Sequence, residues 1–216
     1  MKLFIGNKNY SSWSLRPWLL LAANNISFDE VRIPLYTEGT RSELEKYAPA
    51  GKVPVLQDED IVVWDSLAIC EYVSERYLGG KGWPADPASR AEARSCCAEM
   101  HSGFFAIREN MPMNCRARSR KVTISTESEM EISRIDDLWS GCRKKYSNYG
   151  PWLFGEFSIA DCMFAPVVFR FNTYDVSVSG LSKDYMNRVF EHPQAQLWLA
   201  QSKDEIETID IAEVGI

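Results

Sequence analysis

The chain has 216 residues, of which 45% are hydrophobic and 25% charged, an ordinary composition for a globular protein. Its formal net charge of −6 argues against a general partner of nucleic acid or of anionic membranes, because both need a basic surface. No apolar run approaches the roughly 20 residues of a transmembrane helix, and the first apolar stretch is too short for a secretory signal. We therefore expect a cytoplasmic protein with no nucleic acid partner and no membrane association.

The cysteines and histidines do not form a metal-ligating pattern. No two cysteines make a C-x-x-C pair, and the two histidines, His101 and His192, lie far apart in the sequence. Zinc sites are built from such residues at short spacing, so we predict no metal site. Several cysteines fall inside apolar helical patterns, where a thiol behaves as a small buried hydrophobe. We expect all six to be reduced core or surface thiols: Cys70, Cys96, Cys97, Cys115, Cys142 and Cys162.

Strand-like and helix-like segments alternate in the first part of the chain. In chain order the pattern first predicts a buried strand at 3–5, a helix from Ser14 to about Ala23 and an edge strand at 31–35 that tolerates Pro34. A short polar helix follows at 41–48 and is ended by Pro49 and Gly51. A β-hairpin within 53–64 and a helix that stops at Gly79 and Gly80 complete this part. This βαβαββα order predicts an α/β domain in which helices pack on a mixed sheet.

The stretch GGKGWPADP (79–87) is the best linker in the chain, and strand signals nearly vanish after it. Helical runs follow at 88–111, 128–146, 158–171, 182–190 and 194–204. Breakers such as Pro112, Gly180 and Pro193 separate them. We therefore predict two domains, an α/β domain over 1–80 and an all-helical domain over 88–216.

A cluster of serines lies where the first predicted strand gives way to the first predicted helix, in the stretch SSWSLRPWL (11–19). Because proline lacks an amide hydrogen, Pro17 belongs in the first turn, which places the N-cap at Ser14 or later and leaves Ser11 and Ser12 just before it. Unpaired N–H groups and the helix dipole favour an anion there. The serines either cap the helix only, or donate a hydrogen bond to a ligand's thiolate.

Two later stretches also allow a structural and a ligand-binding interpretation. In APAGKVPVLQ (48–57), Pro54 is either an ordinary strand-edge proline or follows a cis bond, which would expose the Val53 backbone to an extended peptide ligand. In VVWDSLAICEYV (62–73), Asp65 and Ser66 either cap a helix or recognise an α-amino acid end. In the second case Ser66 binds the carboxylate and Asp65 the ammonium.

In this order and spacing, the three motifs resemble the amino-terminal domain of cytosolic glutathione transferases. SSWSLRPWL resembles the serine-type active-site stretch of the theta and zeta classes, GKVPVL the cis-proline loop, and WDSLAICEYV the start of the γ-glutamyl-binding helix. The resemblance extends through the helical half, where FSIADCMFAP (157–166) matches the family's buried capping box of Ser158 and Asp161. It implies the glutathione transferase fold, with a thioredoxin-like, glutathione-binding domain over 1–80 and a helical domain over 88–216.

The family's chemistry, carried onto this sequence, is activation of glutathione as a thiolate that attacks a small electrophile. The theta pattern makes Ser12 the thiolate-stabilising donor, the zeta pattern makes it Ser11, and in other classes a tyrosine such as Tyr10 does this. The resemblance also implies a homodimer and assigns the remaining glutathione contacts. These contacts are Lys52 to the glycine carboxylate, unless it is merely solvated, Val53 and cis Pro54 to the cysteinyl backbone, and Asp65 and Ser66 to the γ-glutamyl end.

Family members build the second-substrate pocket from the loop at the first helix and from the fourth helix. The corresponding candidates are Tyr10, Trp13, Phe104, Phe105, Met111, Met113 and Arg116. Methionines and aromatics at helical spacing are more often core residues than pocket residues. Arg116 belongs to the run CRARSRK (115–121), which is either a solvated loop or a basic wall that favours anionic co-substrates.

Two departures from the family pattern bear on function. Asp65 stands where many members have glutamate, and Trp13 replaces the cysteine of the zeta motif. The second departure argues against maleylacetoacetate isomerase activity. Conjugation of glutathione is therefore the leading hypothesis, with glutathione-dependent peroxide reduction or isomerisation and a non-catalytic interaction protein of the same fold as the alternatives.

Overall fold

The computed structural model describes residues 1–48 and 50–215, so Pro49, expected to end a helix, and Ile216, the last residue of the expected second domain, lie outside the described residues. The amino-terminal part contains a four-stranded sheet in the order β2-β1-β3-β4. β1 and β2 are parallel, whereas β1 pairs with β3, and β3 with β4, in the antiparallel sense. The strands are β1 (Lys2–Ile5), β2 (Asp29–Arg32), β3 (Val55–Asp58) and β4 (Ile61–Trp64).

Most of the predicted elements of this part are confirmed. The helices are α1 (Ser12–Ala23), α2 (Thr40–Tyr47) and α3 (Ser66–Tyr77), and β3 and β4 form the expected hairpin. The strand predicted at 31–35 is the edge strand β2, but it ends before Pro34, which has no amide hydrogen to donate to a ladder. The prediction of the βαβαββα order is confirmed.

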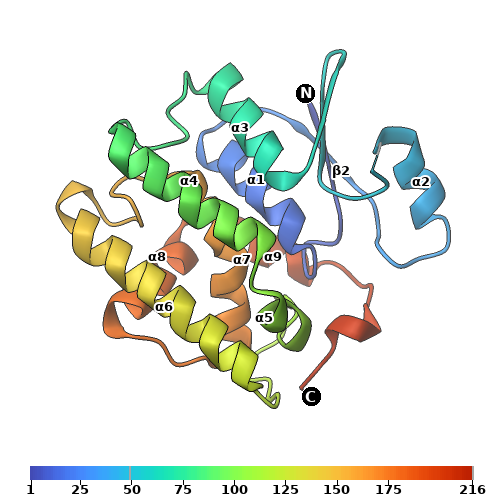
Figure 1. The fold of residues 1–216 in the computed structure, drawn as a ribbon. Coiled ribbons are helices and arrows are strands. Elements are labelled where there is room, and N and C mark those ends of the chain that lie inside the picture. The colour runs from blue at the N-terminus through green and yellow to red at the C-terminus, as the bar shows by residue number, and fades with distance from the viewer. Residues whose placement is uncertain (49, 216) are drawn as a thin grey trace.

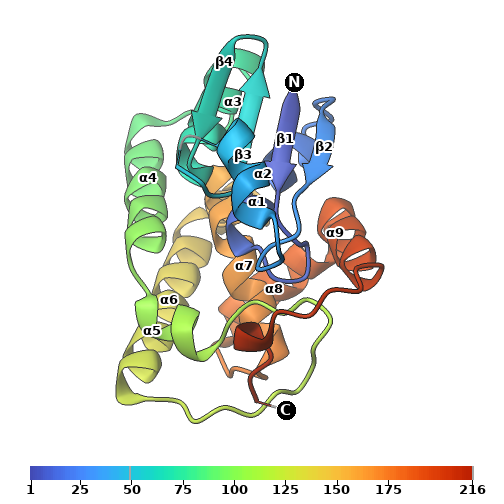
Figure 2. The ribbon, with the colours of Figure 1, turned by 90° about the vertical axis from the view of Figure 1, so that its right-hand side faces the viewer.

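Alternating side chains of β1 separate the two faces of the sheet. Leu3 and Ile5 belong to the main hydrophobic core with residues of α1 and α3. Phe4 points to the other side, into a smaller cluster with Leu44 of α2 and Val55 of β3. This is the period-two pattern of a strand covered on both faces. Figure 2 shows the resulting layers, with α1 between the sheet and the helical part of the molecule.

Over its described residues, the second part of the chain is helical, as predicted, apart from two isolated β-bridges (Trp152 with Gly155, Phe154 with Glu156). Its helices are α4 (Pro87–Ser102), α5 (Phe105–Asn110), α6 (Thr126–Tyr146), α7 (Ile159–Thr173), α8 (Gly180–Glu191) and α9 (Pro193–Lys203), with short 3-10 turns at Ser147–Tyr149 and Asp210–Ala212. The single helix predicted over 88–111 is wrong: Gly103 is extended and Phe104 adopts a φ of +59°, which ends α4 before α5 begins. Among the described residues, no helix has both the length and the apolar character needed to cross a membrane.

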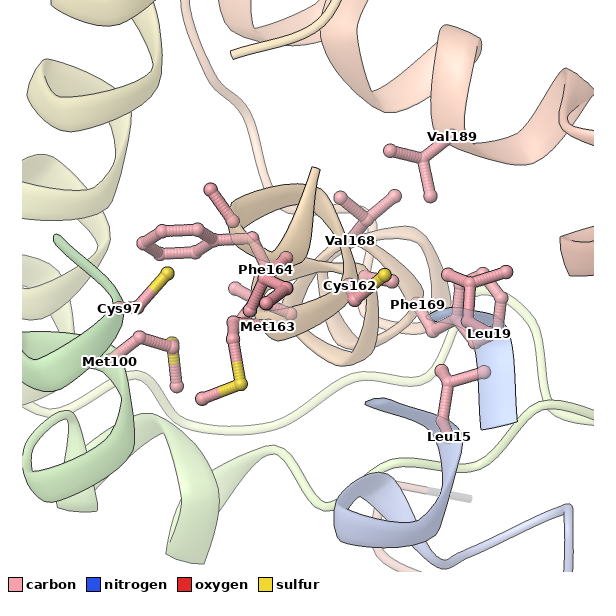
Figure 3. Close-up of a cluster of buried hydrophobic side chains, with 14 of the residues drawn as sticks. Leu15, Leu19, Cys97, Met100, Cys162, Met163, Phe164, Val168, Phe169 and Val189 are labelled. Carbon is pink, nitrogen blue, oxygen red and sulfur yellow. The ribbon is translucent and has the colours of Figure 1, made fainter. Parts of the chain in front are cut away.

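Helix α7 is the centre of the core. Figure 3 shows Cys162, Phe164 and Val168 of α7 surrounded by side chains from α1, α4 and α8. Because α1 packs directly on α7, the helical part lies against the start of the first helix. All six cysteines are free and buried. We retain 1–80 and 88–216 as the proposed domain bounds.

The capping box predicted at the start of α7 is confirmed. Asp161 accepts a hydrogen bond from the Ser158 amide at 2.9 Å and a second from the Leu153 amide at 3.1 Å. The carboxyl is completely enclosed, and burial raises the pKa of Asp161 to about 6. Asp161 therefore joins the loop before α7 to the helix itself.

Candidate functional site

Helix α1 begins earlier than the sequence predicts. Ser11, not Ser14, is the N-cap: its Oγ accepts from the Ser14 amide at 3.4 Å and donates to Ser14 Oγ at 2.7 Å. Ser14 Oγ in turn accepts from the Gly6 amide at 3.1 Å. The Ser11 cap satisfies the Ser14 amide in the first turn, and Pro17 lies inside the helix. The prediction that Pro17 fixes the N-cap at Ser14 is wrong.

The two candidate serines differ in what their hydroxyl groups do. The Ser11 hydroxyl donates its one hydrogen bond to Ser14 Oγ and accepts another from the Ser14 amide, so both its bonds serve the cap. The Ser12 hydroxyl accepts a hydrogen bond from Nη2 of Arg170, on α7, at 3.2 Å. Since the acceptor lone pair of Ser12 is occupied by a cation, its own proton remains available for a ligand. The geometry thus distinguishes the serines where the sequence did not.

The cis-proline loop forms a pocket beside this helix start. The Val53–Pro54 bond is cis, as predicted. A pocket of about 390 Å³ opens here, within the range of ligand sites. It brings together the predicted contacts to the cysteinyl backbone, the glycine carboxylate and the γ-glutamyl end with two tryptophans, its lining being Trp13, Ala50, Lys52, Val53, Pro54, Trp64, Asp65 and Ser66. Neither Ser11 nor Ser12 lines it, but both directly precede Trp13 in the chain.

The Val53 backbone is free to pair with a ligand. Strand β3 begins only at Val55, so Val53 lies outside the sheet ladder. Within the described part of the chain, its amide and carbonyl form no backbone hydrogen bond. An extended peptide laid along this loop would satisfy both groups, as a strand added to a sheet edge does.

The start of α3 supplies the polar end of the pocket. Asp65 is the N-cap, with Oδ1 accepting from the amides of Leu67 at 2.9 Å and Ala68 at 3.1 Å. Its φ of +79° and ψ of 133° lie in a region that residues with a Cβ rarely adopt, a form of strain that clusters at ligand sites. Ser66 is buried, and its Oγ accepts from Nη1 of Arg16 at 3.1 Å.

Arg16 is an incompletely satisfied buried cation. The residue is 0% exposed, and its Nη1 donates to Ser66. Its Nε and Nη2 have no hydrogen-bond partner among the described residues. Its guanidinium lies 4.3 Å from the centre of the Trp13 ring, a cation–π contact. Burial lowers the pKa of Arg16 to about 9, and the neighbouring Arg108 guanidinium contributes to this. The group is still charged at neutral pH.

The structure adds His101 to the site, a residue whose sequence position bears only on the absence of a metal-ligating pattern. Its Nε2 lies 3.0 Å from Oδ2 of Asp65, and its ring meets that of Trp13 edge to face at 5.3 Å. Burial lowers the pKa of His101, so the ring is mainly neutral at pH 7 and donates to the carboxylate. The signal was present: His101 continues the four-residue spacing of the buried Ala93 and Cys97 on α4.

Most of the second-substrate candidates lie elsewhere. Only Trp13 lines the pocket. Met111, Met113 and Phe104 are buried in the main core, whereas Phe105 is 70% exposed. None of these four lines the pocket beside the cis-proline loop, and their assignment to a second-substrate pocket stays a prediction.

Tyr10 and Arg116 face the carboxy-terminal segment instead of the pocket. The Tyr10 hydroxyl donates to Glu213 at 2.7 Å and accepts from Nη2 of Arg116 at 2.9 Å. Arg116 also donates to the carbonyls of Glu205 and Glu207. Arg116 of the basic run therefore holds the carboxy-terminal segment, and the hydroxyl of Tyr10 is bonded to a carboxylate.

Comparison with protein families agrees with this arrangement. The model of the glutathione S-transferase amino-terminal domain matches residues 10–76, which contain the serines, the cis-proline loop and the start of α3. The model of the glutathione S-transferase carboxy-terminal domain matches residues 124–200, which run from the loop before α6 into α9.

The chain is also similar to individual proteins. A stringent starvation protein A homologue of Haemophilus ducreyi is 26% identical over 184 residues, which cover 78% of this chain and 82% of that protein. A probable maleylacetoacetate isomerase of Caenorhabditis elegans is 36% identical over 94 residues, 44% of each chain.

Solved structures show the same fold. A glutathione transferase homologue from Burkholderia gl BGR1, with bound glutathione, has a TM-score of 0.70 and 22% identity, covering 94% of this chain and 98% of its own. A maleyl pyruvate isomerase, described as a bacterial zeta-class glutathione S-transferase, has a TM-score of 0.73 and 19% identity, covering 97% and 100%. The thioredoxin-like domain followed by a helical domain is thus confirmed.

Proposed function

The chain belongs to the glutathione transferase family, and from this premise we propose that it binds glutathione beside the cis-proline loop and activates the thiol for attack on a small electrophile. The observation that carries the proposal is the Ser12 hydroxyl, whose oxygen is held by the Arg170 guanidinium at 3.2 Å. A free thiol has a pKa of about 8.5, so a site must favour the thiolate to make it abundant at neutral pH. Each unit by which the pKa falls corresponds to about 1.4 kcal/mol of preferential binding of the thiolate.

Among the candidate donors, we assign the thiolate contact to Ser12. The proton of Ser11 is donated to Ser14, and the hydroxyl of Tyr10 is bonded to Glu213 and Arg116. Ser12 is also the first residue of α1, where the helix dipole favours negative charge. This makes the protein a serine-type member of its family.

The pocket supports the binding of the rest of the tripeptide. The free amide and carbonyl of Val53 suit the cysteinyl backbone, and the exposed Lys52 suits the glycine carboxylate. At the other end, Ser66 suits the γ-glutamyl carboxylate, since Arg16 occupies its acceptor side and leaves its proton to donate. Asp65 then meets the ammonium group.

Glutathione-dependent isomerisation is the second candidate. It is favoured by the guanidinium of Arg108, which lies 4.8 Å from the centre of the Trp13 ring and places a cation near the pocket for a substrate that carries a carboxylate. The isomerases among the similar proteins point the same way. Trp13, in the position of the zeta-class cysteine, argues for conjugation or peroxide reduction instead.

We further propose that the protein is a cytoplasmic homodimer, as the family resemblance implies. The exposed apolar side chains of β4 (Ile61, Val62 and Trp64) offer a surface of the kind that dimers bury. Sedimentation of the purified protein would give the mass of a dimer; a monomer at micromolar concentration would contradict this part of the proposal.

Calorimetric titration with glutathione and with S-methylglutathione tests the proposed function. Both should bind, and catalysis should be measured in parallel with a chloronitroarene, an organic hydroperoxide and a maleyl-type acid to identify the reaction. Ser12→Ala should lower catalysis by about 100-fold or more, comparable to loss of a strong transition-state donor, whereas Ser11→Ala should act mainly on stability. Failure of the wild-type protein to bind either ligand would overturn the proposal.

A further inference from the structure

We propose that Arg170 is a positioning residue for the sulfur of bound glutathione: its guanidinium, held against the Ser12 hydroxyl, provides the positive charge that keeps the sulfur ionised. This inference rests on the proposed function and deepens it. It shifts the source of activation from the serine, which has no charge, to a residue of the helical domain.

The geometry brings Arg170 to the start of α1 from the opposite side of the domain interface. Arg170 lies on α7, and its Nη2 donates to Ser12 Oγ at 3.2 Å. Its Nη1 donates to the carbonyl of Met111 at 2.5 Å and to that of Arg108 at 3.4 Å. All three acceptors are neutral, and they fix the guanidinium in one orientation.

Nothing in the surroundings of Arg170 neutralises its charge. Among the described residues, no carboxylate forms an ion pair with it. The titratable groups that face it are Arg108 of α5, Tyr174 at the end of α7 and Cys115 in the loop after α5. Burial raises the pKa of both Tyr174 and Cys115 to about 12, so these two are neutral at pH 7, and Arg108 adds positive charge.

Burying a cation without a counter-ion lowers the stability of the fold, and titratable groups perturbed in this way cluster at functional sites. Burial lowers the pKa of Arg170 to about 9, yet the group remains charged at neutral pH. The missing anion is explained if the ligand supplies it. A thiolate that accepts from the Ser12 hydroxyl would complete the chain guanidinium–hydroxyl–sulfur and place both charges in a region of low dielectric.

The size of the effect follows from the distance. With the Ser12 oxygen between them, the guanidinium and the sulfur lie about 6.5 Å apart, and at an effective dielectric of about 20 this shifts an ionisation by roughly two pKa units. The helix terminus and the serine add to this.

Arg170 also has a structural role, since it joins α7 to the carbonyls at the end of α5. The two roles predict different results. Loss of the structural role lowers stability and weakens all ligands alike. Loss of the charge raises the pKa of the bound thiol but leaves the affinity for S-methylglutathione, which has no thiol to ionise, almost unchanged.

The experiment is a pH titration of bound glutathione, followed by the ultraviolet absorbance of the thiolate, together with calorimetric binding of S-methylglutathione. We expect Arg170→Gln to raise the thiol pKa by roughly two units, and Arg170→Lys, which keeps the charge, by less than one. Arg188→Gln, which removes an exposed arginine of α8 paired with Glu191, is the matched control and should not change it. An unchanged thiol pKa in Arg170→Gln overturns the inference.

Ser12→Ala provides a test that leaves Arg170 in place, should Arg170→Gln not fold. The retained guanidinium should keep the pKa of the bound thiol below that of free glutathione. A return to the value of free glutathione would overturn the inference. If the wild-type protein binds neither glutathione nor S-methylglutathione, the proposed function itself fails, and this inference with it; if wild type binds both with an acidic thiol that Arg170→Gln retains, only the inference fails.

Discussion

Arg16 donates a hydrogen bond to Ser66 at 3.1 Å and has no carboxylate partner among the described residues. The same relationship recurs between Arg170 and Ser12. In both pairs a buried guanidinium occupies the acceptor side of a serine at the start of a helix, α3 in one case and α1 in the other. Each serine is thereby prepared to donate, one toward the proposed carboxylate and one toward the proposed thiolate of the same ligand.

Replacing Arg16 should separate stability from binding. Removal of a buried charge that has a single hydrogen bond is often stabilising, so Arg16→Met should leave the free energy of unfolding unchanged or raise it by about 1–3 kcal/mol. The affinity for S-methylglutathione should fall about tenfold, because Ser66 loses its orienting donor. Urea denaturation and calorimetry measure the two quantities. A variant that is strongly destabilised yet binds normally would show that Arg16 serves the fold alone.

His101 should make glutathione binding depend on pH. The charged groups that face it are Asp65, Arg16 and Arg108, and burial lowers its pKa. As pH falls below that value the ring gains a proton, neutralises Asp65 and repels the ligand's ammonium group. The affinity for S-methylglutathione should therefore fall several-fold between about pH 7 and pH 5.

The matched variant is His101→Gln, which keeps a donor for Asp65 but cannot titrate. Its affinity should change less over this range than that of the wild-type protein. Equal pH profiles for the two proteins would show that His101 does not control the site.

Asp161 should make the stability of the fold decrease with pH. Its pKa in the folded state is raised to about 6 from 3.8, so between these values the folded protein holds a proton that the unfolded chain releases. Its contribution is therefore complete below about pH 3.8 and is lost as pH rises through about 6, a change of up to about 3 kcal/mol.

The difference between wild type and Asp161→Asn in urea denaturation at several pH values isolates this effect, since Asn cannot titrate. Asp161→Ala should cost about 2–4 kcal/mol below about pH 4, because the amides of Ser158 and Leu153 lose their acceptor, and this cost should shrink as pH rises through about 6. A constant difference between wild type and Asp161→Asn would contradict the raised pKa.

Local sequence patterns predicted the parts of the molecule that depend on neighbouring residues. The strand at Leu3 to Ile5, the hairpin around Glu59 and the capping box of Ser158 and Asp161 follow from alternation, turn residues and a three-residue spacing. The error at the start of α1 has the same origin. The rule for Pro17 considers one missing amide, whereas the bonds between Ser11 and Ser14 stabilise an earlier start.

Such local patterns cannot predict which charged residues contact the site. Arg170 is 158 residues from Ser12 in the chain and meets it only because α7 packs across α1. An arginine inside the apolar stretch VVFRFNT is a recognisable anomaly, but the sequence does not tell which group it faces. Likewise, the hydrogen bond of the Tyr10 hydroxyl is made to Glu213, which lies 203 residues away in the chain.

A crystal structure of the protein with glutathione tests the central claim most directly. The account predicts the tripeptide along Val53, in the pocket that Trp13 and Ser66 line, with its sulfur within hydrogen-bond distance of Ser12 Oγ and Arg170 still bonded to that oxygen. A sulfur beside Ser11 or Tyr10, or a tripeptide bound outside this pocket, would contradict it.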